Sequence, residues 1–536
     1  MCAETENIEV DSKEKPQVFL KKLVFNDSTE LSLTRNSVIV FTGANNSGKS
    51  QVLKDIELCL DVANNSSAIV VDKIEYDYCG EIDEEGFLKD RFQLNQQGNL
   101  QLYETGVAFE KHTLQNSWKL RKFYGGLHRL FVKRLDTVAR ITSSNDLVRS
   151  TYPEKHPIYK LNKSDTLATT LSEYFRQAFG VDLVVNRNEM QTIPLHVGQA
   201  PNKTSFTMDM QDDYYKEVSA LPKLQNQGDG MRSFASILLD TFTSEYSITL
   251  IDEPEAFLHP PQARTLGKML AKNNPCNRQL LISTHSEDFL QGLLDADNDN
   301  VTIIRIDRID NVNKMSILPN DEIKRLWGNP LLRYSNILSG LFHEKVVVCE
   351  SDYDCLFYQA VMDAMYESRG DVAPDILFTH CGGKSRAKDV VKALKAVDVP
   401  VVAVCDFDLL NSSQNFKPLV AAFGLEWEST LEVDMKIIYD SMNSKKDAWN
   451  DIKKIGKIGF TGDAPAAYET VESICKSIGL FIVPVGEMEC FDKTVNKEKK
   501  EWVYHILENY ELATEPKLNE ARIFVQKIID FKPSTI

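Results

Sequence analysis

The feature that most constrains the fold is a short apolar run joined to a helical segment by a glycine-rich loop. Residues 37–42 read SVIVFT, residues 43–50 read GANNSGKS, and a helical pattern follows directly. A strand, a loop of the form GxxxxGK[ST] and a helix, in this order, direct consecutive backbone N–H groups toward phosphate oxygens. The sequence therefore predicts a phosphate-binding loop in an α/β unit.

The residue types within this loop predict how a nucleotide would be held. Lys49 would pair with the β- and γ-phosphates, and the Ser50 hydroxyl would ligate Mg²⁺. An ordinary glycine-rich turn is the alternative, but the flanking strand and helix favour the phosphate loop. The predicted nucleotide contacts are Gly43, Asn45, Asn46, Ser47, Gly48, Lys49 and Ser50.

Two later apolar runs end in groups that would complete such a site. Residues 247–251 end in Asp252 and Glu253. A carboxylate at the end of a strand can hold magnesium through water while its neighbour polarises the attacking water. We therefore assign Asp252 to the metal and Glu253 to general-base catalysis. Residues 279–284 end at His285, which can reach the γ-phosphate or hold the attacking water.

Length and charge limit the class of protein. The chain has 536 residues and 43% hydrophobic residues, which is enough for several packed units. Its 61 Lys and Arg against 78 Asp and Glu give a net charge of −17, which excludes a simple nucleic-acid coat protein. Ten cysteines without a CxxC spacing predict neither a disulfide framework nor a zinc ribbon. The acidic start and the lack of a long apolar segment predict a cytoplasmic chain with no membrane contact.

One internal stretch reverses the overall acidity. Residues 111–149 hold nine Lys and Arg against Asp136 and Asp146, and apolar residues recur there at helical spacing. The pattern predicts a basic amphipathic helix, either a solvated face or a surface that follows phosphates or binds a partner. A second helix is expected over residues 166–179, ending at Gly180.

A second set of carboxylates follows strands in the last 200 residues. Strands at 345–349, 376–379 and 399–404 alternate with helices, a βαβαβ pattern whose parallel strands end at one edge. Carboxylates crowded there repel one another unless cations neutralise them, and hard oxygen ligands suit Mg²⁺ or Mn²⁺. Two such ions can activate water for phosphodiester cleavage. The carboxylates are Glu350, Asp406 and Asp408, and either Lys384 or Lys493 could supply a cation to the scissile phosphate.

Four motifs of the first half together resemble an ABC-type ATPase head. They are GANNSGKS as Walker A, QGDGMRS (227–233) as a signature-like turn, EPEAFLHP (253–260) as the continuation of Walker B, and STHS (283–286) with a switch histidine. EPExxLHP resembles the OLD (overcoming lysogenization defect) family. This resemblance implies ATP as cofactor and a head dimer, in which Gly228, Gly230 and Ser233 contact the nucleotide of the partner. The usual LSGGQ is absent.

The carboxylate set resembles the TOPRIM domain of topoisomerases, primases and OLD nucleases. Glu350 and Asp354 fit ExxxD, Asp406 and Asp408 fit DxD, and Ser351 stands where family members often have glycine. A Gly-x-x-Glu turn supplies a second-metal ligand in the OLD pattern. GEME (486–489) fits this turn, which implies Glu489 as the ligand, with Glu487 as the next choice.

These resemblances define an expected architecture and function. An ABC-type P-loop head would comprise residues 1–110 and 221–340. Residues 111–220 would form a helical insertion for dimerisation or partner binding. Residues 341–536 would form a doubly wound α/β TOPRIM domain with a helical C-terminal part. The expected function is ATP-regulated, metal-dependent DNA cleavage, nicking or double-stranded, in bacterial anti-phage defence. The alternative is an ATP-dependent sensor or scaffold whose TOPRIM domain recruits a partner without cutting.

The same family context suggests partners. The chain would act as a homodimer through its heads, or as a tetramer. Retron-linked systems imply a reverse transcriptase with msDNA as partner, and Gabija-like complexes imply another defence component.

Overall fold

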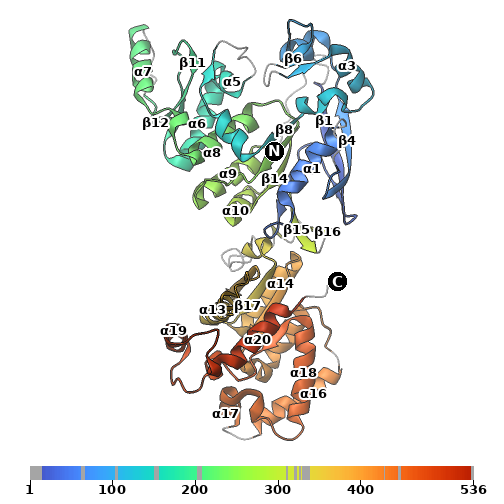
Figure 1. Ribbon diagram of the computed structural model, residues 1–536, viewed down its shortest axis with the longest axis vertical. Helices are drawn as coiled ribbons and strands as arrows, with labels where there is room; N and C mark the ends of the chain where they lie inside the picture. Colours follow the sequence, from blue (N-terminus) through green and yellow to red (C-terminus); the bar gives the residue numbers. More distant parts are fainter. Residues whose placement is uncertain are drawn as a thin grey trace. The chain divides into compact units, whose positions relative to one another are not determined.

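The structure, a computed structural model, describes residues 15–532 except 62–66, 103–106, 150–155, 202–207, 310–311, 319–322, 325–327, 329–337, 428 and 445–447. It divides into two compact units, Met1–Asn320 and Asp321–Ile536 (Figure 1). The division comes earlier in the chain than the expected boundary at 340/341. The acidic N-terminal residues, from which we expected an unexported chain, lie outside the described residues.

A six-stranded sheet is the framework of the first unit. Its strands are β3 (Val38–Thr42), β8 (Val132–Leu135), β13 (Ile248–Asp252), β14 (Gln279–Ser283), β15 (Val301–Ile309) and β16 (Val312–Leu318). The order is β16-β15-β3-β14-β13-β8, with β16 antiparallel and all others parallel. β3, β13 and β14 are the apolar runs recognised in the sequence, and they are almost fully buried, as in a sheet covered on both faces. Their C-terminal ends therefore meet at one edge.

Helices cover both faces of this sheet (Figure 1). They are α1 (Lys49–Leu60), α8 (Asp229–Thr243), α9 (Pro260–Lys272) and α10 (Glu287–Asp295). On one face Val52 and Ile56 of α1 pack in a common core with Phe41 and Leu281. α1 starts at Lys49, so its N-terminus faces the predicted phosphate loop.

Smaller antiparallel sheets flank the framework. One contains β1 (Gln17–Phe25), β2 (Glu30–Ser32) and β4 (Val71–Cys79), and the other β5 (Phe92–Leu94), β6 (Leu100–Leu102) and β7 (Ala108–Phe109), with α2 (Lys89–Arg91) before it. The buried amide of Gln279 donates to the carbonyl oxygen of Leu20 at 2.7 Å and accepts from its N–H at 2.8 Å. This pair of bonds fastens β1 to the start of β14.

Residues 111–149 do not form the predicted basic amphipathic helix. They form α3 (Lys111–Lys119), a 3₁₀ segment (Tyr124–Leu130), β8, α4 (Thr137–Ser143) and β9 (Leu147–Val148). Gly125 and Gly126 have φ angles of 62° and 76°, which interrupt a helix. Leu127, Leu130 and Leu135 face the core of the unit instead of one helix stripe. The prediction was wrong because apolar residues of a turn and a strand happened to recur at helical spacing.

The insertion consequently starts later than the predicted residue 111. β8 pairs in parallel with β13, with Leu135 opposite Ile251, so these residues belong to the central sheet. Basic side chains of this stretch form ion pairs within the unit, among them Lys133 with Asp240 and Arg134 with Glu57.

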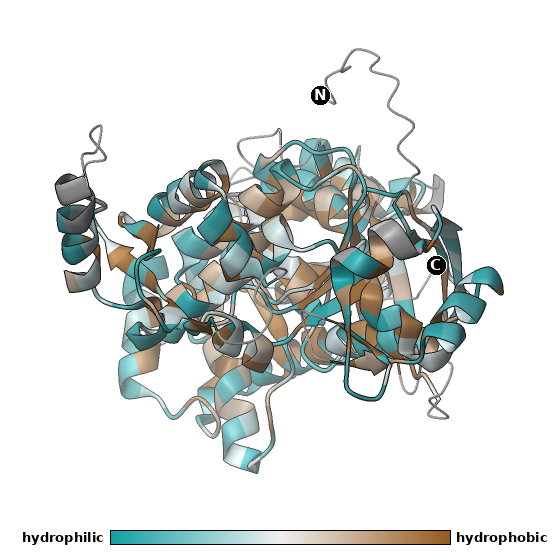
Figure 2. Ribbon diagram, turned by 90° about the horizontal axis from the view of Figure 1, so that it is seen from above, coloured by the Kyte–Doolittle hydropathy of each residue, from teal (hydrophilic) through white to brown (hydrophobic). Residues whose placement is uncertain are grey.

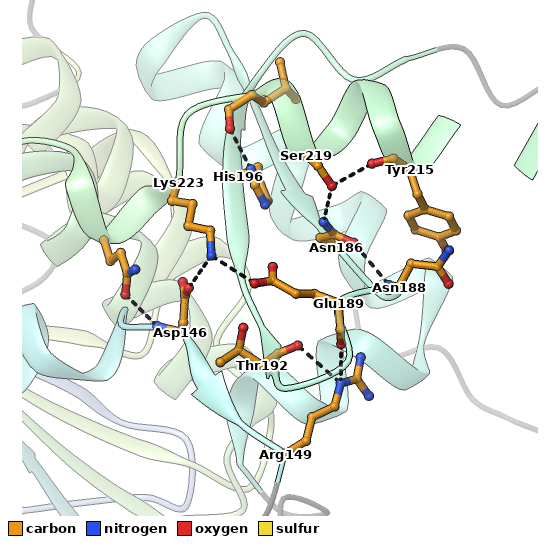
Figure 3. Close-up of polar contacts among 12 residues, drawn as sticks. Asp146, Arg149, Asn186, Asn188, Glu189, Thr192, His196, Tyr215, Ser219 and Lys223 are labelled. Carbon is orange, nitrogen blue, oxygen red and sulfur yellow. Dashed lines mark hydrogen bonds and ion pairs between the residues drawn. The ribbon is translucent and has the colours of Figure 1, made fainter. Parts of the chain in front are cut away.

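The insertion itself is mixed α/β. It contains β9, α5 (Pro157–Lys163), α6 (Asp165–Phe179), β10 (Asp182–Val185), β11 (Thr192–Ile193), β12 (Leu195–Gly198) and α7 (Met208–Ala220). α6 ends at Gly180, which confirms the second predicted helix. Figure 3 shows the polar network of this region, in which the Lys223 ammonium lies 2.9 Å from Asp146 and 3.3 Å from Glu189.

A four-stranded parallel sheet is the framework of the second unit. Its strands are β17 (Lys345–Cys349), β18 (Ile376–His380), β19 (Val401–Cys405) and β20 (Leu480–Ile482), in the order β18-β17-β19-β20. The predicted βαβαβ pattern is confirmed, and the strand predicted at 345–349 has the same bounds in the structure. The C-terminal ends of β17, β19 and β20 are neighbours.

Helices surround this second sheet. They are α13 (Asp352–Arg369), α14 (Lys384–Ala396), α15 (Ser413–Ala422), α16 (Ser429–Asn443), α17 (Ala448–Ile455), α18 (Ala464–Ile478), α19 (Lys499–Asn509) and α20 (Asn519–Asp530). Val347 and Val402 pack against α13, α19 and α20 in one core. Val346 points to the opposite face, where it lies with Leu394 of α14 beside Gly340.

Figure 2 shows hydrophobic residues concentrated on the strands and hydrophilic residues along the outer helices. Among the described helices, none is both long enough and apolar enough to span a bilayer.

A buried lysine ties the first strand of the second unit to the last helix. Lys345 is 8% exposed, and its ammonium donates to the carbonyl oxygens of Ile528, Ile529 and Phe531 at 3.0, 2.7 and 2.8 Å. These carbonyls belong to the C-terminal end of α20 and the residues after it, where backbone acceptors lack partners within the helix. Lys345 therefore acts as a C-terminal cap across the sheet.

Replacing this cap should loosen α20. We expect Lys345→Met to destabilise the second unit by about 1–3 kcal/mol, because three carbonyl oxygens, at buried and partly buried hydrogen bonds, lose their donor. Hydrogen exchange should show faster exchange of the α20 amides. Lys527→Met, at an exposed position of the same helix, is the matched control. Equal protection of α20 in both variants would contradict the capping role.

Candidate functional site

The phosphate loop leaves β3 through a tightly packed turn. Gly43 has a φ of 138°, and a Cβ there would lie 2.2 Å from the carbonyl oxygen of Ile306, so only glycine fits. The ammonium of Lys49 donates to the carbonyl oxygens of Gly43 and Ala44 at 2.8 and 2.7 Å. Lys49 is 3% exposed, and it lies at the N-terminus of α1, where the helix dipole favours anions. The loop thus has the form that the sequence predicted.

The remaining predicted contacts lie along the same loop. Asn45 and Asn46 are exposed, and Ser50 is half-buried in the first turn of α1. The hydroxyl of Ser47 is buried and has no hydrogen-bond partner among the described residues, which fits a loop whose polar groups are completed by a nucleotide. Asn313 of β16 donates to the carbonyl oxygen of Ser47 at 2.5 Å. This support from a distant strand was not predicted.

Asp252, Glu253 and His285 meet at the edge of the sheet. Asp252 pairs with Ser283 in the β13–β14 register, and the Ser283 hydroxyl donates to its carboxylate. The Glu253 carboxylate lies 3.3 Å from Nε2 of His285. Burial, assisted by the nearby ammonium of Lys49, lowers the pKa of His285, so the imidazole is neutral near pH 7. The three residues therefore converge as the sequence predicted.

Glu255 supports His285 through a hydrogen bond to its backbone. Its carboxylate accepts the backbone N–H of His285 at 2.7 Å, and burial raises its pKa. Glu255 was visible in the EPEAFLHP motif, but no spacing argument assigned it a role. The structure makes it part of the support for His285.

Arg140 is a second group that sequence analysis missed. It is fully buried, and it donates to the carbonyl oxygens of Asp252 and Glu253 and to the hydroxyl of Ser233. Burial lowers the pKa of its guanidinium, and the carboxylates of Glu255 and Asp252 oppose that shift. Its basic sequence context suggested a surface helix, so the sequence carried no signal for this position.

The signature-like turn begins α8. Gly228 is exposed, and a Cβ on Gly230 would lie 2.5 Å from the carbonyl oxygen of Phe257, so the turn packs closely on the loop after β13. Ser233 is fully buried, and its hydroxyl faces Arg140. The glycines are therefore placed at the start of the helix, whereas the serine points into the unit.

A second polar centre lies at the C-terminal edge of the sheet in the other unit. The backbone N–H of Asp406, after β19, donates to the carboxylate of Glu350, after β17, at 3.1 Å. Asp408 accepts from the ammonium of Lys384, at the start of α14, at 2.6 Å. The structure thus brings Glu350, Asp406, Asp408 and Lys384 together, as expected from parallel strands.

The carboxylates of this centre are poorly solvated and repel one another. Burial and the charge of Asp408 raise the pKa of Glu350 to about 7. Burial, followed by the charge of Glu350, raises the pKa of Asp406 well above its usual range. One oxygen of Asp408 is buried without a hydrogen-bond partner among the described residues. Crowded carboxylates with an unpartnered oxygen fit a cation-binding site.

The other predicted ligands have partners of their own. Asp354 caps α13 by accepting the N–H and hydroxyl of Ser351, at 2.8 and 3.0 Å. Glu489 accepts the N–H of Lys499 at 2.8 Å. Glu487 pairs with the ammonium of Lys453 in α17 at 2.6 Å.

The structure also separates the two candidate lysines. Lys384 contacts the centre through Asp408, whereas Lys493 is exposed. Lys453 was missed because it lies in a helix far from every motif. Glu487, Asp408 and Asp406 raise its pKa, in part through the hydrogen bond to Glu487, so it remains charged beside the centre.

Within the described part of the chain, no three His, Cys, Asp or Glu side chains converge closely enough to hold a metal ion. The donor types nevertheless fit one, because they are all carboxylate oxygens, which hard divalent cations prefer. Lys384 and Lys453 supply positive charge to the carboxylates in this arrangement.

Two protein families match separate parts of the chain. Residues 189–290 match an AAA domain of the AAA_21 family, and residues 341–408 match the TOPRIM domain of overcoming lysogenization defect protein-like proteins. The first match contains the signature-like turn, Asp252, Glu253 and His285. The second contains Glu350, Asp354, Asp406 and Asp408.

Individual proteins are also similar. The OLD nuclease of Thermus scotoductus is 23% identical over 295 residues, which cover 51% of this chain and 52% of that protein. The chain thus spans about half the length of this curated relative. An SMC head bound to the C-terminal winged-helix domain of ScpA is 14% identical, with a TM-score of 0.35. The match covers 57% of this chain and 99% of the SMC chain. The SMC head domain of Thermotoga maritima is 10% identical, with a TM-score of 0.29. The match covers 57% of this chain and 100% of the head domain.

The family matches bear on the fold and on general chemistry. An ATPase domain and a TOPRIM domain imply the use of a nucleotide and of divalent metal. The chain therefore combines an AAA-type ATPase domain with an OLD-like TOPRIM domain, and this composition confirms its resemblance to OLD-family ATPase–TOPRIM proteins.

Proposed function

We propose that the chain is an ATP-regulated, divalent-metal-dependent DNA endonuclease that acts in bacterial anti-phage defence. The observation that carries this proposal is the placement of Glu350, Asp406 and Asp408 after neighbouring parallel strands at one sheet edge, beside the ammonium of Lys384. Crowded carboxylates and a lysine are the groups that metal-assisted phosphodiester cleavage requires.

In the proposed mechanism, Glu350, Asp406 and Asp408 would hold Mg²⁺ or Mn²⁺, with Asp354 and either Glu489 or Glu487 as further ligands. When bound by these residues, a divalent cation would supply Lewis-acid chemistry for phosphodiester cleavage. Lys384 would place positive charge beside the scissile phosphate, with Lys493 as the other candidate. Burial keeps competing water away from the carboxylates and strengthens their interaction with cations.

At the other centre, Lys49 and the loop N–H groups would bind the phosphates of ATP, with Mg²⁺ on Ser50 and Asp252. Glu253 would accept a proton from the attacking water, and neutral His285 would orient that water. We propose a head homodimer, or a tetramer, in which Gly228 and Gly230 approach the partner's nucleotide. Ser233 belongs to this set in the ABC pattern, although its hydroxyl is buried.

We further propose a cytoplasmic setting with DNA as substrate and a reverse transcriptase with msDNA, or another defence component, as partner. These assignments rest on the family resemblance. The basic side chains between residues 111 and 149 are candidates for DNA or partner contacts.

A second function is favoured by one observation. Lys384 and Lys453 form ion pairs with Asp408 and Glu487, so two candidate ligands already have cationic partners. The same pairs would suit an ATP-dependent sensor or scaffold whose TOPRIM domain binds a partner without cutting. Metal-dependent cleavage of DNA by the purified chain would separate the two functions.

The first prediction concerns the carboxylates. With plasmid DNA and Mg²⁺ or Mn²⁺, we expect the wild-type chain to nick or linearise the DNA and a chelator to stop it. Glu350→Gln and Asp406→Asn should each reduce the rate by about 100-fold or more, because the metal supplies several kcal/mol of stabilisation. ATP binding should be unchanged. Asp389→Asn, at an exposed site on α14, is the control.

Cleavage that both carboxylate variants retain would exclude this centre as the nuclease. A wild-type chain that binds ATP but cuts no DNA with either metal would favour the scaffold function.

The second prediction tests the phosphate loop. Lys49→Ala should weaken ATP binding by about 100-fold, because it removes a buried charge from the phosphates. Lys54→Ala, at an exposed position of the same helix, should bind ATP as the wild type does. Fluorescence titration with a labelled ATP analogue measures both affinities. Equal affinities would refute the loop assignment.

The third prediction separates the candidate lysines. Lys384→Met should slow DNA cleavage by about tenfold to 100-fold, since it removes a preorganised cation from the reacting phosphate. Lys493→Met should cleave at nearly the wild-type rate, because its side chain is exposed. The reverse ranking of the two variants would assign the role to Lys493.

A further inference from the structure

A buried arginine joins the candidate base to the signature-like helix. Arg140 lies in α4, between the edge strand β8 and the insertion, and it is 0% exposed. Burying a guanidinium is costly unless its donors are satisfied. Besides the Thr137 hydroxyl of its own helix, the guanidinium donates to oxygen atoms of Leu135, Asp252, Glu253 and Ser233. It therefore links the end of β8, the turn after β13 and α8 to one another.

One side of the guanidinium holds the backbone that carries Glu253. It donates to the carbonyl oxygen of Asp252 and, at 3.0 Å, to that of Glu253. Glu253 has a φ of 49°, a left-handed conformation that non-glycine residues adopt only when their surroundings impose it. Arg140 thus fixes the two peptide oxygens on either side of the strained turn from which the candidate base projects.

The other side of the guanidinium holds the signature-like helix. Its Nε donates to the hydroxyl of Ser233 in α8 at 3.1 Å. Ser233 has no surface exposure, so this hydroxyl is committed to the interior of the unit. A shift of α8 along its axis would therefore displace the Ser233 hydroxyl and, through this hydrogen bond, the guanidinium of Arg140.

α4 itself is anchored at both ends, which gives this contact a fixed base. Asp136 caps its first turn by accepting the N–H of Ala139 at 2.8 Å. Near its other end the Arg232 guanidinium donates to the carbonyl oxygen of Ile141 at 3.0 Å. The chain then continues to Asp146, which Lys223 holds at 2.9 Å (Figure 3). The helix is therefore tied to the turn before α8 as well as to α8.

We propose that Arg140 is a positioning residue for ATP hydrolysis, which orients Glu253 through the Asp252–Glu253 backbone and makes that orientation depend on the signature-like helix through Ser233. The inference rests on the proposed ATPase function and deepens it. The hydrogen bonds described for Arg140 all go to oxygen atoms of the protein. Its effect passes through the peptide groups that it holds.

Steady-state ATP hydrolysis and ATP binding by the full chain test this inference. Arg140→Lys keeps the charge but replaces the planar guanidinium, whose Nε, Nη1 and Nη2 each donate at a different place, by a single nitrogen at the end of a flexible chain. We expect its kcat to fall by about 100-fold, because small displacements of a catalytic group have effects of this size. The affinity for ATP should stay within about twofold of wild type, since the phosphate loop is untouched.

Ser233→Ala removes only the link to the helix, and it keeps the proposal testable if Arg140→Lys fails to fold. Its kcat should fall by about tenfold with unchanged ATP affinity, the effect of losing one hydrogen bond to a charged group. The double variant should be no slower than Arg140→Lys alone, because both changes act on one contact. Lys268→Met, at an exposed position of α9 in the same unit, should hydrolyse ATP as the wild type does.

The possible failures are distinct. A wild-type chain that binds ATP but never hydrolyses it would overturn the proposed ATPase function. If the wild type hydrolyses ATP and both Arg140→Lys and Ser233→Ala have the same kcat as the wild type, only the role of Arg140 is overturned. Loss of ATP affinity in proportion to kcat would also overturn it, since that result indicates damage to the binding site.

Discussion

Parallel pairing of buried strands is the constraint on which both candidate sites depend. Parallel neighbours place their C-terminal ends at the same edge, so residues far apart in sequence become neighbours in space. Asp252 lies opposite Ser283 in one sheet, and Cys349 lies opposite His380 in the other. A slip of one residue would exchange the side chains on the two covered faces of the sheet and shift the carboxylates relative to their neighbours at the edge. The hydrophobic effect on the strands therefore also sets the geometry of the polar groups.

This dependence explains what could be predicted from sequence. β3, β13, β14 and β17 are short, continuous apolar runs that end in polar residues, and such runs identify both a strand and the group at its end. β8 escaped prediction because VKRL is short and two of its four residues are basic. Its membership of the sheet is decided by pairing with β13, a tertiary contact that no local pattern contains. Arg140, Lys453 and Asn313 were missed for the same reason, because their contacts are made with segments that meet only after folding.

The two sites differ in how nearby cations offset the negative charge of their carboxylates. In the first unit the charges of Asp252 and Glu253 lie near a buried guanidinium and the phosphate-loop lysine, and both cations donate mainly to backbone oxygens. In the second unit the lysines bond directly to candidate ligands, Lys384 to Asp408 and Lys453 to Glu487. The net charge of −17 therefore says little about either centre, because each builds its own local field.

This difference has a consequence for how a metal could enter the second site. A divalent cation that binds Asp408 would compete with the ammonium of Lys384, and the other oxygen of Asp408, which has no hydrogen-bond partner among the described residues, is available to it. Because Lys384 is the first residue of α14, its backbone stays at the edge of the sheet after the ion pair breaks. The released ammonium would then remain near the carboxylates, where it could contact a substrate phosphate. Occupation of the carboxylates and availability of the lysine would thus be two parts of one event, which a rigidly prebuilt metal cage could not couple.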